Sequence, residues 1–236
     1  MKNFFQVASQ IKKNTNFSEF YSKYFSGIFS PYLAAACVGT RITANHLTIL
    51  MIPCGIIGSL LIMSTNPLFC LYGSLCYVLL NILDAADGQL ARYIKKPSAF
   101  GDYLDRVAHY ITNSAFVLAV GLYLFFVTDN IAYIYLMFFC ELCILGDEVI
   151  RDLLVACGVV NLKDSNPGTR KSEKSKTRLI SNSFIKNIWS IFFSNIAIFI
   201  NTNFLFMLEI YYLLFSIIVI LKMFLRLPAL KRNYST

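Results

Sequence analysis

Long apolar runs constrain the fold of this 236-residue chain more than any other feature. A helix rises about 1.5 Å per residue, so about 20 apolar residues span a hydrocarbon layer of roughly 30 Å. Runs of this length occur six times, and none shows the alternation typical of a membrane β-strand. They lie at about 46–64, 69–93, 99–127, 131–158, 183–201 and 204–226. The sequence therefore predicts an all-α, polytopic membrane protein with six transmembrane helices.

The basic residues predict how these spans are oriented. The chain has 21 Lys and Arg against 13 Asp and Glu, a net charge of +8. No Lys or Arg lies in the turns around Asn66, Asp129 and Asn201, whereas the 92–96 turn, the 159–182 loop and both terminal segments are basic. Basic segments favour the cytoplasm, so we expect both termini and the active site on the cytoplasmic side of a bacterial inner membrane or a plasma membrane.

The distribution of charge also bears on partners. The basic residues are divided among four segments at the lipid boundary, without a soluble module that reads bases. We therefore expect no nucleic-acid partner, and we expect contacts with membrane lipids. Faces rich in Phe and Tyr in the later spans could form a homodimer or simply meet lipid.

A stripe of apolar residues at helical spacing precedes the first span. It predicts an amphipathic helix over about 15–37 that lies in the membrane interface or, alternatively, packs on the bundle without touching lipid. The first 14 residues lack the apolar core of a signal peptide, so we expect them to be retained. We expect 1–236 to form one integral-membrane domain with its transmembrane bundle over about 46–226. The stripe consists of Phe17, Phe20, Tyr21, Tyr24, Phe25 and Ile28.

Carboxylates and an imidazole gather at one end of the second and third spans. Successive helical residues turn by about 100°, so the small and acidic residues here form one stripe on each span. The short turn at 95–98 makes the two spans antiparallel neighbours, whose stripes can face each other at the membrane edge. Ionisable residues in such positions are expensive and usually functional. The stripes consist of Asp84, Asp87, Gly88 and Ala91 in one span and Gly101, Asp105 and His109 in the next.

These carboxylates need compensation, because like charges repel strongly in a low dielectric. Protons, basic partners or a divalent cation can supply it, and an all-oxygen cluster favours Mg²⁺ or Mn²⁺. Arg92 is placed to meet phosphate, and the small residues let a nucleotide or a helix approach closely. Alternatively, the carboxylates pair with Arg92, Arg106 and Arg151 as structural links between helices.

The spacing of these residues resembles the signature of the CDP-alcohol phosphotransferase family, also called CDP-alcohol phosphatidyltransferases. That pattern is DGxxAR with an Asp three residues before it, followed by a Gly and two Asp at four-residue spacing. This chain matches every position except the last. The segment 42–48, ITANHLT, is similar to the start of the first span in that family, and the predicted six-span layout is similar as well.

The resemblance implies a transferase that cleaves a CDP-linked donor, either a CDP-alcohol or CDP-diacylglycerol, and releases CMP. The substituted phosphoryl group passes to a lipid or small polyol acceptor in phospholipid or related headgroup synthesis. The long interfacial helix is more similar to members that use CDP-linked soluble alcohols.

The resemblance also assigns roles to individual residues. It implies that Asp84, Asp87 and Asp105 bind Mg²⁺ or Mn²⁺, and that Asp105 also serves in catalysis. The implied nucleotide-binding residues are Asp84, Gly88, Ala91, Arg92 and Gly101.

His109 stands where the family pattern has its fourth Asp. An imidazole can accept the proton of an alcohol, so a general-base role could survive the exchange. It can also bind a metal with altered preference, or mark lost activity in a chain that still binds nucleotide. All three interpretations remain open at this point.

Two further questions concern the acceptor and the function class. Arg41 and Arg151 are candidates for binding an acceptor phosphate, whereas the basic residues at 170–178 equally suit a solvated loop. The rival function is a six-span cation transporter. A transporter predicts charges along a path through the bilayer, but the outer halves of spans two and three are almost uncharged.

Overall fold

The computed structural model describes residues 3–15, 26–96 and 98–156, together with 214, 217, 218 and 221. Within these residues all regular secondary structure is helical, so the predicted all-α class is confirmed. The helices of this part of the chain are α1 (Phe4–Lys13), α2 (Gly27–Cys37), α3 (Ala44–Met63), α4 (Pro67–Tyr93), α5 (Ala99–Thr128) and α6 (Ala132–Ala156).

Three of these helices, α3, α4 and α5, are long and apolar enough to cross a membrane. They agree closely with the first three predicted spans, and α6 falls within the fourth. Local capping sets the ends: Asn66 accepts a hydrogen bond from the backbone N–H of Leu68 at the start of α4, next to Pro67. The predicted spans 183–201 and 204–226 lie outside the described residues, apart from four isolated helical positions.

The amino-terminal helices differ from the prediction. The helix α1 was not expected, and it is amphipathic, with Val7, Ala8 and Ile11 buried. Thr15 follows the end of α1, where its hydroxyl donates to the Ile11 carbonyl, and the start of the expected interfacial helix over about 15–37 lies outside the described residues. The helix α2 lies within the predicted range, and residues 16–25 lie outside the described part of the chain.

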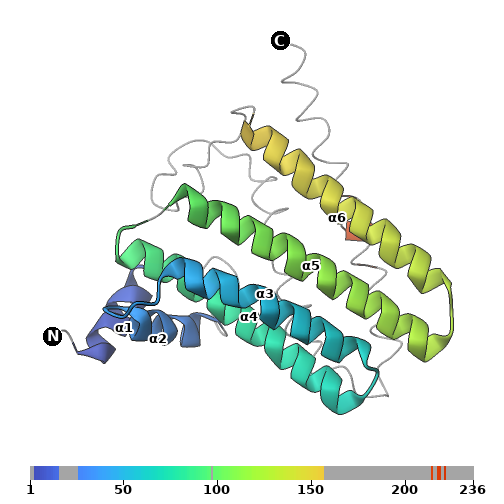
Figure 1. Cartoon of the computed structure of the whole chain (residues 1–236), viewed down its shortest axis with the longest axis horizontal. Helices are drawn as coiled ribbons and strands as arrows, with labels where there is room; N and C mark the ends of the chain where they lie inside the picture. The colour runs from blue at the N-terminus through green and yellow to red at the C-terminus, as the bar shows by residue number, and fades with distance from the viewer. Residues whose placement is uncertain are drawn as a thin grey trace, which may run out of the picture.

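The central helix of the described bundle is α3, which packs along both α4 and α5. Figure 1 shows these helices running side by side, with α6 beyond α5 and with α1 and α2 at one end. Glycines permit the close approach: a Cβ on Gly73 of α4 would lie 2.6 Å from the Gly58 carbonyl oxygen of α3. Small residues therefore set the spacing of the helices that carry the predicted site.

A few side chains of α4 and α5 form a seam beside α3, the helix that packs against both. The Tyr77 hydroxyl donates to the Thr112 carbonyl oxygen at 3.1 Å. The Tyr77 ring packs edge-on against Phe116, with 4.9 Å between ring centroids. Both residues are almost fully buried, so this contact fixes α4 relative to α5 in the apolar part of the bundle.

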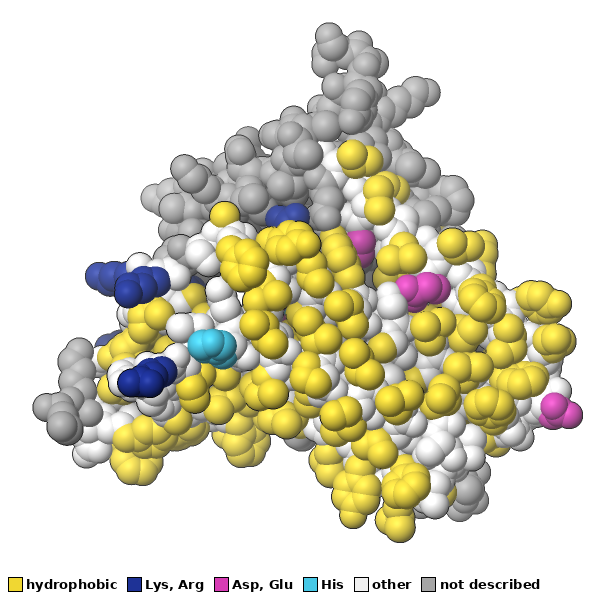
Figure 2. Space-filling model, viewed as in Figure 1, with side chains coloured by type: hydrophobic (Ala, Val, Ile, Leu, Met, Phe, Trp, Pro, Cys, Tyr) yellow, Lys and Arg dark blue, Asp and Glu magenta, His cyan; other side chains and the backbone are white. Residues whose placement is uncertain are grey.

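The surface matches a bilayer environment. In Figure 2, hydrophobic side chains cover the broad face formed by the long helices, and Lys and Arg gather toward the end where α1 and α2 lie. Many large apolar side chains on α3 and α4 are exposed, including Leu60 at 58% and Leu75 at 50%. Such a continuous apolar surface would be unfavourable in water and is expected in lipid.

Gly73→Ala tests the glycine contact. The added Cβ would meet the Gly58 carbonyl oxygen and, at 3.0 Å, the backbone nitrogen of Ile62, so α3 and α4 must separate. We expect a loss of about 1–3 kcal/mol from overpacking, more than alanine returns in helix propensity. Thermal unfolding in detergent micelles measures it, with the lipid-facing Leu60→Ala as control. A wild-type melting temperature for Gly73→Ala would contradict this account of the packing.

Candidate active site

One carboxylate of α4 meets a carboxylate and an imidazole of α5. The Nε2 atom of His109 lies 3.2 Å from Oδ1 of Asp84 and 3.4 Å from Oδ1 of Asp105. The three residues offer one ligand atom each, all within 4.8 Å of one another. Their side chains are 36–43% exposed, so the cluster is accessible. The two stripes predicted from helical periodicity therefore converge at these residues.

The backbone explains why these three side chains converge. Asp105 and His109 lie one turn apart on the same face of α5. Asp84 lies two turns after Tyr77 on α4, and His109 lies one turn before Thr112 on α5. The Asp84–His109 contact therefore extends the seam that the Tyr77–Thr112 hydrogen bond begins. The turn between the helices begins with Lys95 at a positive φ of 52°. Periodicity and this short connection together bring the acidic faces into register.

Asp87 occupies a different environment from the other carboxylates. Only 8% of it is exposed, and it accepts a hydrogen bond from the Thr48 hydroxyl of α3. It interacts electrostatically with Asp84 and Asp105 but is not part of the converging ligand group. The predicted metal set is therefore divided: Asp84, Asp105 and His109 come together, while Asp87 is directed to α3.

Two small residues of the predicted nucleotide set make room for polar side chains. A Cβ on Gly88 would lie 3.2 Å from Nη1 and 3.3 Å from Nη2 of Arg92, so the guanidinium covers this glycine. Arg92 interacts electrostatically with Asp87 and Asp84. Its positive charge therefore lies beside the acidic stripe, where a phosphate group would be attracted.

Gly101 has an equivalent place at the start of α5. A Cβ there would lie 3.0 Å from Oγ of Ser98 and 3.1 Å from Oδ1 of Asn45. Ser98 caps α5 by accepting from the Gly101 N–H. Ala91 is half-buried one turn beyond Gly88 on α4. These positions border the carboxylates, and their binding roles remain predictions.

The two arginines predicted to bind an acceptor phosphate are not near the cluster in any described contact. Arg41 is exposed and precedes Thr43, the N-cap of α3, by two residues. Arg151 belongs to α6, and its side chain lies outside the described part of the structure. Their proposed role stays a prediction.

Two polar residues of α3 were not among the predicted site residues. Asn45 lies beside Gly101, and Thr48 donates to Asp87. They are one helical turn apart, inside the 42–48 segment at the start of an apolar span. Two polar residues on one face at the edge of such a span are a signal that would have found them.

The cluster has the chemistry of a divalent metal site. Two carboxylate oxygens and one imidazole nitrogen suit Mn²⁺ well, whereas Mg²⁺ prefers oxygen ligands. The side chains also retain access to outside ligands that would complete the coordination. Asp84, Asp105 and His109 could therefore hold a divalent ion.

Asp84→Asn tests metal binding. The variant removes an anionic ligand and should weaken Mn²⁺ affinity by at least about tenfold, since even residues that only hydrogen-bond to metal ligands contribute that much. Titration of purified protein with Mn²⁺, followed by electron paramagnetic resonance of the free ion, measures the affinity. Asp102→Asn is the matched control, because Asp102 is an exposed acidic residue in the first turn of α5. Equal Mn²⁺ affinity in both variants would contradict the assignment.

Comparison with known families identifies the chain's family. The model of the family described as CDP-alcohol phosphatidyltransferase matches residues 41–225, which include α3, α4, α5 and the acidic cluster. No curated protein matches the chain. The apolar helices and the family together identify an integral membrane protein, and a divalent metal is typical of the family. The chain belongs to the CDP-alcohol phosphatidyltransferase family, and this membership implies CDP-alcohol phosphotransferase activity.

Proposed function

We propose that this protein cleaves a CDP-linked donor, releases CMP and transfers the substituted phosphoryl group to an alcohol in phospholipid or related headgroup synthesis. The convergence of Asp84, Asp105 and His109 within 4.8 Å supports this proposal most directly. The donor is a CDP-alcohol or CDP-diacylglycerol, and the acceptor is a lipid or a small polyol. Family membership supports the reaction type, and the accessible acidic cluster supports the location.

Each residue of the site has a proposed part in binding. Asp84 and Asp105 would hold Mg²⁺ or Mn²⁺, and Asp87 contributes negative charge while Thr48 holds its carboxylate. His109, beside both ligands, is kept free of the ion to act as base. When bound, the ion neutralises charge on the bridging phosphates and on the departing CMP. The donor's nucleotide part is bound by Asp84 and by the residues around it, namely Gly88, Ala91, Arg92 and Gly101.

The transfer makes one bond to phosphorus and breaks another. The acceptor oxygen bonds to the phosphorus of the substituted phosphoryl group. The bond from that phosphorus to the CMP oxygen breaks, and CMP leaves with the bonding electrons. His109 accepts the hydroxyl proton, and Asp105, 3.4 Å from Nε2, orients the imidazole and stabilises its positive charge.

We also propose the chain's membrane arrangement. Residues 1–236 form one domain with six transmembrane helices, of which α3, α4 and α5 are the first three. The acidic cluster faces the cytoplasm, because the basic segments adjoin the same ends of these helices. Arg41 and Arg151 bind the acceptor phosphate in this arrangement.

Asp87→Asn tests the reaction. The change removes one negative charge from the buried Thr48 contact without altering side-chain size, so we expect CMP release to fall by about 10²-fold or more. Purified protein is incubated with CDP-diacylglycerol or a panel of CDP-alcohols and Mg²⁺ or Mn²⁺, and products are identified by mass spectrometry. The control is Asp102→Asn. Ion flux in vesicles without CMP release would favour the transporter, and nucleotide binding without turnover would favour an inactive family member.

Two substitutions at His109 test its role. His109→Ala should lower kcat by about 10²- to 10⁴-fold, the usual contribution of a general base, with much less effect on CMP binding. His109→Asp restores the family pattern and should preserve or raise activity. Steady-state kinetics and calorimetric CMP titration separate the effects. Equal losses of turnover and binding in His109→Ala would indicate a metal-binding or structural role, and an inactive Asp variant would mean that the site requires nitrogen.

A further inference from the structure

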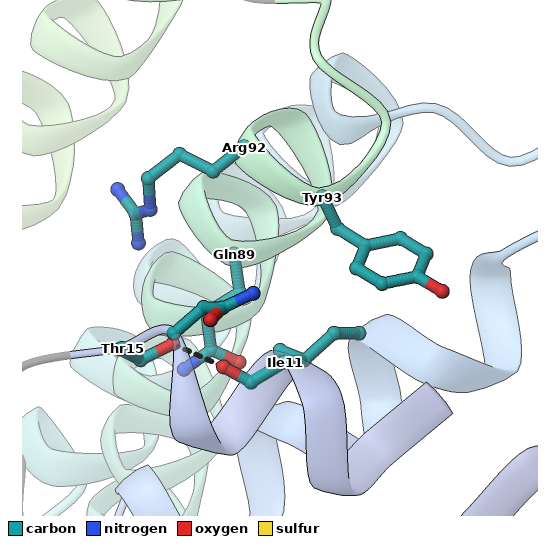
Figure 3. Close-up of a pocket in the computed structure, with 6 residues that line it drawn as sticks. Ile11, Thr15, Gln89, Arg92 and Tyr93 are labelled. Atoms are coloured by element: carbon teal, nitrogen blue, oxygen red, sulfur yellow. Dashed lines mark hydrogen bonds between the residues drawn. The ribbon is translucent and has the colours of Figure 1, made fainter. Parts of the chain in front are cut away.

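A small pocket lies between the carboxyl ends of α1 and α4. Its volume is about 50 Å³, and a water molecule needs about 10–15 Å³ of such space, so the pocket suits a small polar group. In Figure 3, Gln89 and Arg92 project from α4 beside Thr15 at the end of α1. The residues that line the pocket are Ile11, Asn14, Thr15, Gln89, Arg92 and Tyr93.

Gln89 carries an unsatisfied hydrogen-bond acceptor. The residue is 2% exposed, and its Nε2 donates to the Ser30 hydroxyl oxygen of α2 at 2.9 Å. Its Oε1 is buried and has no hydrogen-bond partner among the described residues. Buried acceptors are nearly always satisfied, so this oxygen calls for a donor from a molecule that enters the pocket.

The pocket is separate from the acidic cluster. Gln89 follows Asp84 by five residues, which places it about 140° round α4. Asp84 is directed to His109 of α5, whereas Gln89 is directed to α2. Arg92 borders both places, since its guanidinium has five donors and covers Gly88 while the side chain lines the pocket. A molecule bound at Gln89 is therefore distinct from the reactants, and its binding does not depend on the proposed function.

The depth of the pocket in the membrane indicates what surrounds it. The helix α4 is long and apolar enough to cross a membrane and ends at Tyr93, so its last turn lies at the level of the lipid headgroups. The amphipathic helix α1 ends in Lys12 and Lys13, and its Phe5 is 68% exposed. Such a helix lies in the interface of an anionic membrane. Figure 2 shows Lys and Arg gathered toward this end of the molecule. Phospholipid headgroups are therefore the polar groups next to the pocket.

The lining residues specify an anionic headgroup that also donates a hydrogen bond. Of the six described lining residues only Arg92 is charged, so the pocket favours a phosphate. Gln89 Oε1 only accepts, so the group beside it must donate. The two residues lie one helical turn apart, about 5.4 Å, which suits a phosphate and a hydroxyl of the same glycerol headgroup. A choline headgroup has no donor, and ethanolamine would bring a second positive charge to Arg92.

We propose that this pocket binds the headgroup of a hydroxyl-bearing anionic phospholipid, of which phosphatidylglycerol is the simplest. Gln89 Oε1 accepts from a headgroup hydroxyl, and Arg92 donates to the phosphate. The helix α1 packs mainly on α2, and the Tyr93 hydroxyl of α4 donates to Oε1 of Gln10 at 3.3 Å. The bound lipid adds a second polar link between α1 and α4, and so connects the amino-terminal helix to the membrane-spanning bundle.

Native mass spectrometry of the delipidated full chain in detergent tests this proposal. The protein is offered equimolar phosphatidylglycerol and phosphatidylpropanol, which have the same charge and differ only in the headgroup hydroxyls. As its first bound lipid, the wild type should retain phosphatidylglycerol about tenfold more, the factor expected when one buried acceptor loses its donor. Gln89→Met removes the acceptor and should bring the ratio close to one. Ser30→Ala is the matched control, because it removes the hydrogen bond from Gln89 to α2 but keeps the Oε1 acceptor, and it should keep the wild-type ratio.

Several outcomes would overturn the proposal. Equal retention of the two lipids by the wild type does so, and this comparison stands even if Gln89→Met does not fold. An unchanged ratio in folded Gln89→Met also overturns it. A loss in Ser30→Ala as large as in Gln89→Met would mean that packing against α2, and not the acceptor, sets the ratio. Displacement of phosphatidylglycerol by equimolar glycerol 3-phosphate would assign the pocket to a soluble phosphate ester instead of a lipid.

Discussion

The pairing of Asp84 with His109 is the interaction on which the site depends. A carboxylate at the edge of the hydrocarbon region is costly unless a partner compensates its charge. The imidazole supplies that partner from α5, and it also contacts Asp105 on its own helix. The same requirement explains why a divalent ion suits this place, since a cation compensates the charges of Asp84 and Asp105.

The helix α3 holds α4 and α5, the two helices of the acidic cluster, in this relation. Glycine contacts let it approach α4 closely, and the Gly55 position of α3 has the same function against Thr112 of α5. Its polar end then serves both sides of the site, through Thr48 to Asp87 and through Asn45 beside Gly101. One helix therefore provides the spacing of the bundle and two groups that support the acidic residues.

The carboxyl end of α4 shows how one segment serves several neighbours. Asp84 is directed to α5, Asp87 to α3 and Gln89 to Ser30 of α2. Asp84 and Asp87, three residues apart, lie about 60° from each other on one broad face that meets both α5 and α3, whereas Gln89 lies on the opposite face. The acidic motif is thus one side of a helix that also contacts α2, α3 and α5. Substitutions at nearby positions of α4 therefore affect different helix interfaces.

The amino-acid sequence by itself determined the local features of this protein. Apolar length located α3, α4 and α5, periodicity placed Asp105 and His109 on one face, and motif spacing indicated the family. These properties depend on neighbouring residues, so they can be read along the chain. Only the tertiary structure decided that Asp87 turns to Thr48 and that α1 closes a pocket against Gln89. Such partners come from helices distant in sequence, and side-chain packing between helices selects them.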